Sequence, residues 1–188
     1  MTSAIIIHGM PSKEEYFDSN SPSPANAHWI PWIKNELTSK GITALTPEMP
    51  EPYDPDYKKW SEVFEKFKLD ENSILIGHSC GGGFLVRWLS ENKVKAGKVI
   101  LVAPWIDPNN NHAPKMFSEM KIEDISDYAE TIKLFISLDD DKEELDTTKI
   151  LKNTIGNLKI VEFTDKGHFT TGDMGTNSFP ELLETILS

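Results

Sequence analysis

The residues best suited to chemistry lie in one short glycine-rich segment, Gly77-His78-Ser79-Cys80-Gly81. Its first, third and fifth residues match the pattern G-x-S-x-G, in which a serine hydroxyl is exposed on a tight turn between a strand and a helix. An apolar run precedes the segment and a helical pattern follows it, as this turn requires. We therefore predict that Ser79 is a nucleophile. The alternative is a glycine-rich turn with an incidental serine, which the flanking strand and helix disfavour.

A serine hydroxyl needs a base near neutral pH, usually a histidine that a carboxylate orients. Of the five histidines, His8 ends the first expected strand, and His28 and His112 fall in or beside loops. His78 lies inside the turn, where we expect its side chain to point away from the serine. His168 follows the last expected strand, at the sheet edge where ligand sites of open parallel sheets gather. We predict His168 as the base, with a solvated loop histidine as the alternative.

The acid should follow the nucleophile and precede the histidine in the chain, at the end of a strand. At that place the sequence has three consecutive aspartates, Asp139, Asp140 and Asp141. We favour Asp140 and keep Asp139 and Asp141 as alternatives, since at least two of the three must be solvated acids of a turn. The run lacks the spaced oxygen ligands and the internal glycine of a calcium loop, so we predict no metal site.

Two backbone amides are candidate donors to the oxyanion of an acyl-transfer intermediate. The amide of Cys80 begins a helix and is left without an intrahelical partner. The second donor in this architecture comes from the loop after the first strand, which reads Ile7-His8-Gly9-Met10-Pro11. We predict the backbone N–H of Met10, because Gly9 allows this loop a close approach. An ordinary strand-ending turn is the alternative.

The elements that position these residues follow from the hydrophobic pattern. Six short apolar runs alternate with helical patterns, which is typical of βαβ units and predicts an α/β fold with one parallel sheet covered on both faces. The last run alternates more and is expected near an edge. The expected strands cover residues 4–7, 42–45, 73–76, 99–103, 134–138 and 158–163. The expected helices cover residues 27–40, about 57–68, 84–89, 147–155 and 179–187.

Composition limits the classes of protein and partner. The chain has 188 residues, 38% of them hydrophobic, and we expect one domain over residues 1–188. Its 30 acidic and 19 basic residues give a formal net charge of −11, which disfavours nucleic acid and anionic membranes as partners. A small neutral or cationic ligand fits better.

Further sequence features bear on the location of the protein and on its loops. Cys80 is the single cysteine, so no disulfide within the chain is possible. We find no signal-peptide pattern and no run of ~18 apolar residues, and we expect a cytoplasmic protein. The proline-rich segments 21–24 and 47–55 are predicted to be rigid surface connections.

Several blocks together resemble the small serine hydrolases related to retinoblastoma-binding protein nine, which are alpha/beta hydrolases without a cap domain. The blocks are Trp29-x-x-Trp32, Glu48-Met49-Pro50, the Gly-His-Ser turn, Ser137-x-Asp139-Asp140 and Phe163-Thr164-Asp165-x-Gly167-His168-Phe169. The resemblance implies six parallel strands in the order 2-1-3-4-5-6, with the serine after the third strand. It also implies that Asp140 is the acid. Relatives continue after this acid with an apolar residue and proline, whereas this chain continues Asp141-Lys142-Glu143-Glu144-Leu145.

These observations predict a serine hydrolase that cleaves small esters or related acyl compounds through an acyl-enzyme, with no metal or organic cofactor. Trp105 follows the fourth expected strand and is a candidate wall of the acyl pocket, with core or rim packing as the alternative. A thioesterase, acyltransferase or amidase would use the same triad. A non-catalytic binding protein that keeps the fold, with a protein partner, is the alternative outside catalysis.

Overall fold

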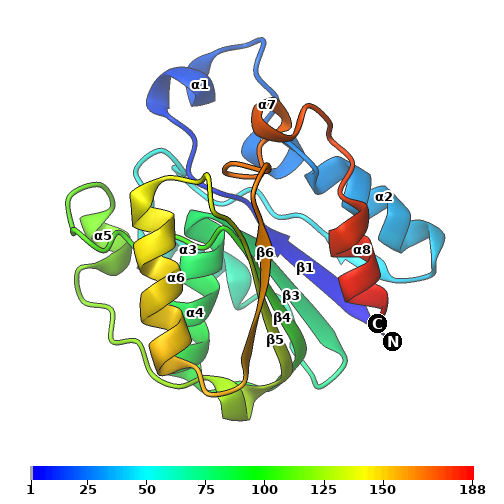
Figure 1. Ribbon diagram of the computed structural model, residues 1–188, viewed down its shortest axis with the longest axis vertical. Coiled ribbons are helices and arrows are strands. Elements are labelled where there is room, and N and C mark those ends of the chain that lie inside the picture. Colours follow the sequence, from blue (N-terminus) through cyan, green and yellow to red (C-terminus); the bar gives the residue numbers. More distant parts are fainter. Residues whose placement is uncertain (1) are drawn as a thin grey trace.

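The computed structural model describes residues 2–188 and has a parallel sheet between two layers of helices (Figure 1). The six strands are hydrogen-bonded in the order β2-β1-β3-β4-β5-β6, which confirms the expected fold class and strand order. As expected, the last strand lies at an edge. The strands are β1 (Ser3–Ile7), β2 (Thr43–Leu45), β3 (Ser73–His78), β4 (Ala96–Val102), β5 (Ala129–Ser137) and β6 (Leu158–Phe163).

The register of the sheet brings the candidate site residues to one edge. Ile7 at the end of β1 pairs with Gly77 in β3, and Ser137 at the end of β5 pairs with Phe163 at the end of β6. Because all strands are parallel, the segments that follow them emerge together at their carboxyl ends. The loop after β1, the turn after β3 and the segments after β5 and β6 therefore lie at the same edge.

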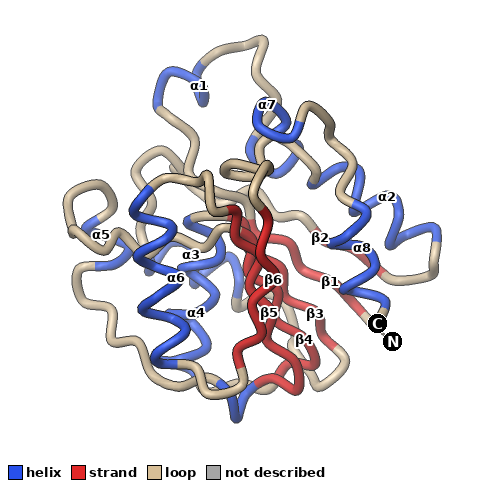
Figure 2. Tube along the Cα trace, in the orientation of Figure 1, coloured by secondary structure: helices blue, strands red, loops and turns tan. Residues whose placement is uncertain are grey.

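Helices cover both faces of the sheet (Figures 1 and 2). On one face lie α2 (Ile30–Ser39) and α8 (Pro180–Leu187), and on the other lie α3 (Tyr57–Phe64), α4 (Cys80–Asn92) and α6 (Lys142–Thr154). In β1 the run from Ala4 to Ile7 is continuously apolar because alternate residues enter two cores: Ile5 and Ile7 pack on the α4 side, and Ala4 and Ile6 on the α2 side. Within residues 2–188 no helix is long and apolar enough to cross a bilayer.

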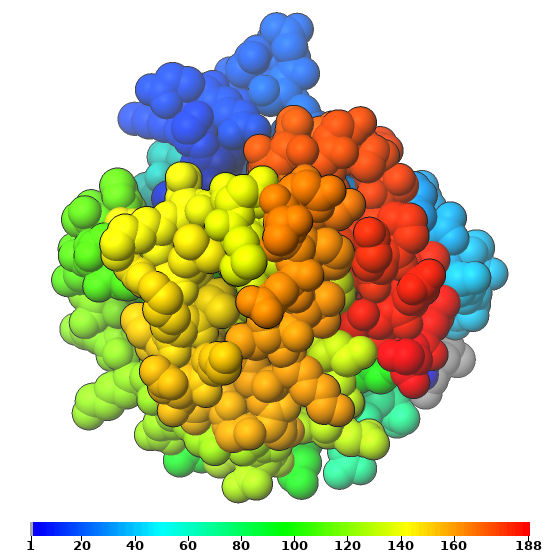
Figure 3. Space-filling model, in the orientation of Figure 1, coloured from blue at the N-terminus to red at the C-terminus, as the bar shows by residue number. Residues whose placement is uncertain are grey.

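Short helices that the periodicity did not predict lie in the connections. They are α1 (Lys13–Phe17), α5 (Pro114–Phe117) and α7 (Thr171–Met174), with 3₁₀ turns at Pro24–Asn26 and Ser126–Tyr128. Each is too short to show a repeating apolar face. The helix α1 has no buried residue, and its segment projects from the molecule at the carboxyl edge of the sheet (Figures 1 and 3).

Some of the expected helix boundaries were wrong. The helix expected over 147–155 begins at Lys142, because Asp141 is extended and serves as the N-cap. Two glutamates in the first turn favour this start, since negative side chains are stabilising near a helix N-terminus. The helix expected from residue 27 begins at Ile30, and the helix expected to residue 68 ends at Phe64. The early start of α6 places its first turn directly after the three aspartates.

Candidate active site

Ser79 occupies the turn between β3 and α4 in a conformation that non-glycine residues rarely adopt. Its φ of 51° and ψ of −121° lie outside the common regions, as is found where surrounding structure holds a functional residue in place. The Ser79 amide donates to the Val102 carbonyl over 2.9 Å, and the Ser79 carbonyl accepts from the Trp105 amide over 3.1 Å. A Cβ on Gly81 would lie 2.4 Å from the Ile7 carbonyl oxygen, so this position admits only glycine.

The loop after β1 lies against this turn. A Cβ on Gly9 would lie 3.1 Å from the Ser79 Cβ, so the missing side chain permits the close approach that was expected. His8 holds the loop through both ring nitrogens. Its Nδ1 donates to the Gly9 carbonyl over 2.7 Å, and its Nε2 accepts from the Met49 amide over 3.0 Å. Among residues 2–188, the backbone amides of Met10 and Cys80 have no hydrogen-bond acceptor. Both therefore remain available to a ligand.

Asp140 is the member of the aspartate run that contacts His168. The two oxygens of its carboxylate lie 3.1 and 3.2 Å from the His168 Nδ1, and its side chain is only 2% exposed. Asp139 instead accepts hydrogen bonds from the Ser137 hydroxyl and the Gly167 amide, and Asp141 begins α6. The chain continues after Asp140 directly into α6, and the Asp140 carboxylate faces His168.

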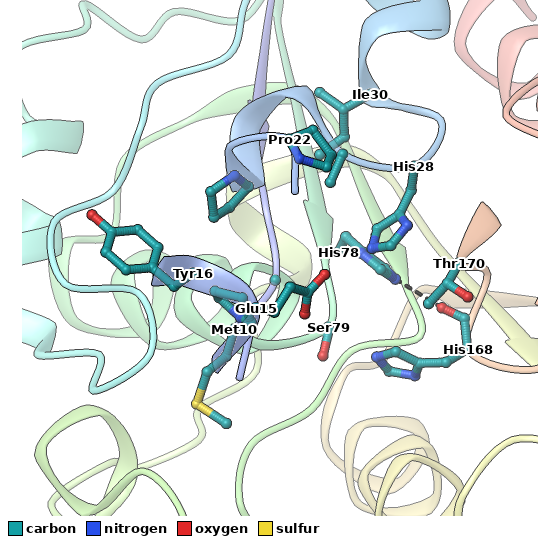
Figure 4. A pocket seen from close by; sticks show the side chains of 14 residues that line it. Met10, Glu15, Tyr16, Pro22, His28, Ile30, His78, Ser79, His168 and Thr170 are labelled. Carbon is teal, nitrogen blue, oxygen red and sulfur yellow. Dashed lines mark hydrogen bonds between the residues drawn. The ribbon is translucent and has the colours of Figure 1, made fainter. Parts of the chain in front are cut away.

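His78 and His28 lie closer to the site than expected. We expected the His78 side chain to point away from Ser79, but it lines the same cavity, and its Nε2–H donates to the His168 carbonyl over 2.8 Å (Figure 4). Burial lowers the pKa of His78 well below 6.5, so the ring is a neutral donor that holds the His168 loop. His28 accepts from the Thr171 amide over 3.2 Å and packs against His78.

A cavity of about 320 Å³ connects these groups (Figure 4). Ser79, His168, His78 and Thr170 form its floor and one side. The remaining walls come from the segment that follows β1: Gly9, Met10, Pro11, Glu15, Tyr16, Pro22, Pro24, Ala27, His28 and Ile30. Pro22 and Pro24 of the expected surface connection 21–24 therefore also line the cavity. Figure 4 shows the Glu15 side chain among those that line the same cavity as Ser79.

Trp105, the candidate wall of the acyl pocket, does not line the cavity that contains Ser79, and its surroundings agree with the alternative of core packing. Its side chain is buried, packs edge-on against Phe117 and donates its indole N–H to Glu143 over 2.8 Å. Its backbone passes so close to Gly83 that a Cβ there would lie 2.1 Å from the Trp105 carbonyl oxygen. Trp105 supports the turn that carries Ser79 through packing and backbone contacts.

Glu144 in the first turn of α6 is a further acid at His168. Its Oε1 lies 4.0 Å from the His168 Nδ1. One ligand atom each of Asp140, Glu144 and His168 lie within 4.8 Å of one another, a spacing that also suits a metal ion. Because the His168 Nδ1 donates its proton to Asp140, it offers no lone pair to a metal ion.

The groups around His168 set its charge. Burial by itself lowers the pKa of His168, but the hydrogen bond and charge of Asp140, together with the charge of Glu144, outweigh burial and raise the pKa above 6.5. Burial raises the pKa of Glu144 to about 7, with a contribution from the neighbouring charge of Asp140. Glu144 therefore titrates near neutral pH, and the His168 ring keeps its proton to higher pH than an ordinary histidine.

Comparison with known proteins places the whole chain among serine hydrolases. The serine hydrolase family model matches residues 19–187. Serine hydrolase RBBP9 of Rattus norvegicus is 28% identical over 95% of this chain and 95% of its own length. YdeN of Bacillus subtilis (strain 168) is 26% identical over 94% of this chain and 96% of its own length.

Solved structures share the fold. The crystal structure of the ydeN gene product from B. subtilis superposes with a TM-score of 0.82 at 24% identity, covering 100% of this chain and 97% of that one. The esterase EaEST from Exiguobacterium antarcticum superposes with a TM-score of 0.64 at 14% identity, covering 100% and 91% of the two chains. The family match and these relatives support hydrolase function.

Proposed function

Because the chain belongs to the serine hydrolase family, we propose that it cleaves small esters by transferring the acyl group to Ser79 and then to water. One observation carries this proposal: His168, whose Nδ1 is hydrogen-bonded to Asp140, lines the same cavity as Ser79. Within residues 2–188 the Ser79 hydroxyl has no hydrogen-bond partner, so it is available to a base or a substrate. The proposed steps need no cofactor.

His168 supplies the base in this proposal. With Nδ1–H held by Asp140, the neutral ring has its lone pair on Nε2, the nitrogen that accepts the Ser79 proton. The same nitrogen then protonates the leaving alcohol and later takes a proton from the attacking water. Asp140 keeps this tautomer and stabilises the imidazolium.

The backbone amides of Met10 and Cys80 hold the oxyanion in the proposed mechanism. Both amides lack an acceptor within residues 2–188, and Cys80 also begins α4, where the helix dipole favours negative charge. Such donors stabilise the tetrahedral intermediate more than the planar ester, and this difference lowers the barrier.

The cavity favours small substrates. Its volume of about 320 Å³ is at the lower end of the range for ligand pockets, and proline, methionine and isoleucine form much of its wall. A short acyl chain fits this space, whereas a long chain would extend into solvent. Thioesters and amides would follow the same steps, so the preferred leaving group has to be found by comparing substrates that share one acyl group.

The proposal is tested by mixing the purified protein with a fluorophosphonate probe and with nitrophenyl esters of short and long acids. We expect covalent labelling, and faster turnover of nitrophenyl acetate than of nitrophenyl octanoate, because the cavity is small. A thioester and an anilide of the same short acid compare the leaving groups. A folded protein that is inert toward the probe and all these substrates would contradict catalysis and favour a binding role.

The dependence of kcat/KM on pH should follow the ionisation of His168. The ring must be neutral to accept the serine proton, so kcat/KM should fall as pH decreases through its pKa. Since neighbouring carboxylates raise this pKa, the midpoint should lie above 6.5. Initial rates of ester hydrolysis between pH 5 and about 9 measure it. A rate that stays constant from about pH 5 to 8 would show that His168 is not the base.

A further inference from the structure

Glu144 is a buried carboxyl whose position packing alone does not explain. Its side chain is 12% exposed, and its Oε2 is buried with no hydrogen-bond partner among residues 2–188. A buried polar atom without a partner costs free energy, so such a group calls for a compensating role. Its other oxygen lies 4.0 Å from the His168 Nδ1, on the side already occupied by Asp140.

The start of α6 brings the two carboxyls together. Asp140 precedes the N-cap residue Asp141, and Glu144 lies four residues later, about one helical turn away. Glu143 occupies the same turn but points elsewhere, since its carboxylate accepts from the Trp105 indole over 2.8 Å and from the Asn109 amide over 2.6 Å. Of the two adjacent glutamates, Glu144 is therefore the one whose carboxyl approaches His168.

We propose that Glu144 is a positioning residue that acts through His168, stabilising its imidazolium together with Asp140 and thereby setting the pH range of the reaction. This inference rests on the proposed function of Ser79 and His168. The proton still passes from the Ser79 hydroxyl to the His168 Nε2, and Nδ1 keeps its own proton. Glu144 forms no covalent bond and contributes only its charge.

Other charged groups around His168 do not replace this contribution. From α7, the Asp173 carboxylate accepts from the His168 backbone amide over 3.1 Å and also favours the imidazolium. At the end of β3, the centroid of the His78 ring lies 5.1 Å from that of the His168 ring. Burial lowers the pKa of His78 well below 6.5, so this ring is neutral. Burial likewise lowers the pKa of His28, which faces His78. Near Glu144, the charges of Asp140 and Asp141 oppose its ionisation.

Glu144 differs from these neighbours because its carboxyl changes charge near neutral pH, well above the ordinary range of a glutamate. Its pKa is raised to about 7, mainly by burial, and the charge of His168 opposes that rise. Two groups that attract each other when both are charged titrate as a pair, and they share one proton over a broad range. Removing Glu144 should leave a simpler titration of His168 at lower pH.

The test compares Glu144→Gln with Glu143→Gln, which removes the same charge one residue away. We expect the His168 imidazole signals in NMR spectra to titrate at lower pH in Glu144→Gln, and kcat/KM at pH 7, relative to its plateau, to rise about threefold. Glu143→Gln should leave both unchanged. An active wild type whose His168 titration and pH profile do not move in Glu144→Gln would overturn the inference.

A measurement on the wild type needs no variant to fold. The carboxyl carbon of Glu144, labelled with ¹³C, should titrate at about pH 7 and not near the ordinary value of 4.5. Titration in the ordinary glutamate range would also overturn the inference. Neither NMR measurement depends on turnover, so a failure of the proposed function, seen as an inert wild type, is distinguishable from a failure of the role of Glu144.

Discussion

Replacing Ser79 with alanine should abolish fluorophosphonate labelling and lower kcat for a short ester by about 10⁴-fold or more. The reason is chemical. Alanine has no oxygen to accept the acyl group, so the acyl-enzyme cannot form, and water would have to attack the ester directly. The amides of Met10 and Cys80 and the cavity walls would remain, and they can sustain only the small residual rate that oxyanion stabilisation and binding provide.

The fold of this variant should survive, since the bonds that hold the turn are made by the Ser79 backbone. The contacts with Val102 and Trp105 use the amide and the carbonyl of residue 79, and the side chain takes no part in them. A matched control is Ser61→Ala on α3, because the Ser61 hydroxyl is buried and has no partner among residues 2–188. Equal labelling of wild type and Ser79→Ala would mean that the probe reacts elsewhere.

The sheet and the order of the site residues could be predicted from the sequence because both depend on short-range patterns. A continuously apolar run, such as residues 74–76, indicates a strand that is buried on both faces, and the glycines around Ser79 indicate positions where a side chain would collide with backbone. The positions of Asp140 and His168 then follow from parallel strands, whose carboxyl ends meet at one edge. These inferences needed no knowledge of side-chain packing.

The cavity walls could not be predicted in the same way. They come from residues of the long connection after β1, whose path over Ser79 is decided by tertiary contacts, and Glu15 and Tyr16 lie in a helix too short for periodicity. Trp105 follows β4 at the correct edge, but its indole turns toward Glu143. The strand end predicts where a residue emerges and leaves the direction of its side chain undetermined.

His78 and Glu144 show the same limit closer to the chemistry. The position of His78 within the turn was known, but its hydrogen bond to the His168 carbonyl joins residues 90 positions apart. Glu144 was part of an acidic run that departs from the pattern of related hydrolases. The available signal was its spacing of four residues from Asp140, which becomes meaningful once the run is known to begin a helix.

Replacing Asp140 with asparagine should lower kcat by roughly 10³–10⁴-fold while leaving the fold intact. The asparagine amide can donate a hydrogen bond to Nδ1, which favours the tautomer with the proton on Nε2. His168 in that form cannot accept the serine proton. Because the Asp140 side chain is 2% exposed and both its oxygens lie within 3.2 Å of Nδ1, no water molecule can readily take its place.

The two neighbouring aspartates provide the controls, measured by ester hydrolysis and by urea denaturation. Asp141→Asn should retain nearly full activity, since the Asp141 side chain is exposed and makes no capping hydrogen bond. Asp139→Asn should mainly lower the free energy of unfolding, because Asp139 accepts from the Ser137 hydroxyl and the Gly167 amide. If the large loss of kcat occurred in Asp139→Asn and not in Asp140→Asn, the acid would be Asp139, and the hydrogen bond between Asp140 and His168 would have another purpose.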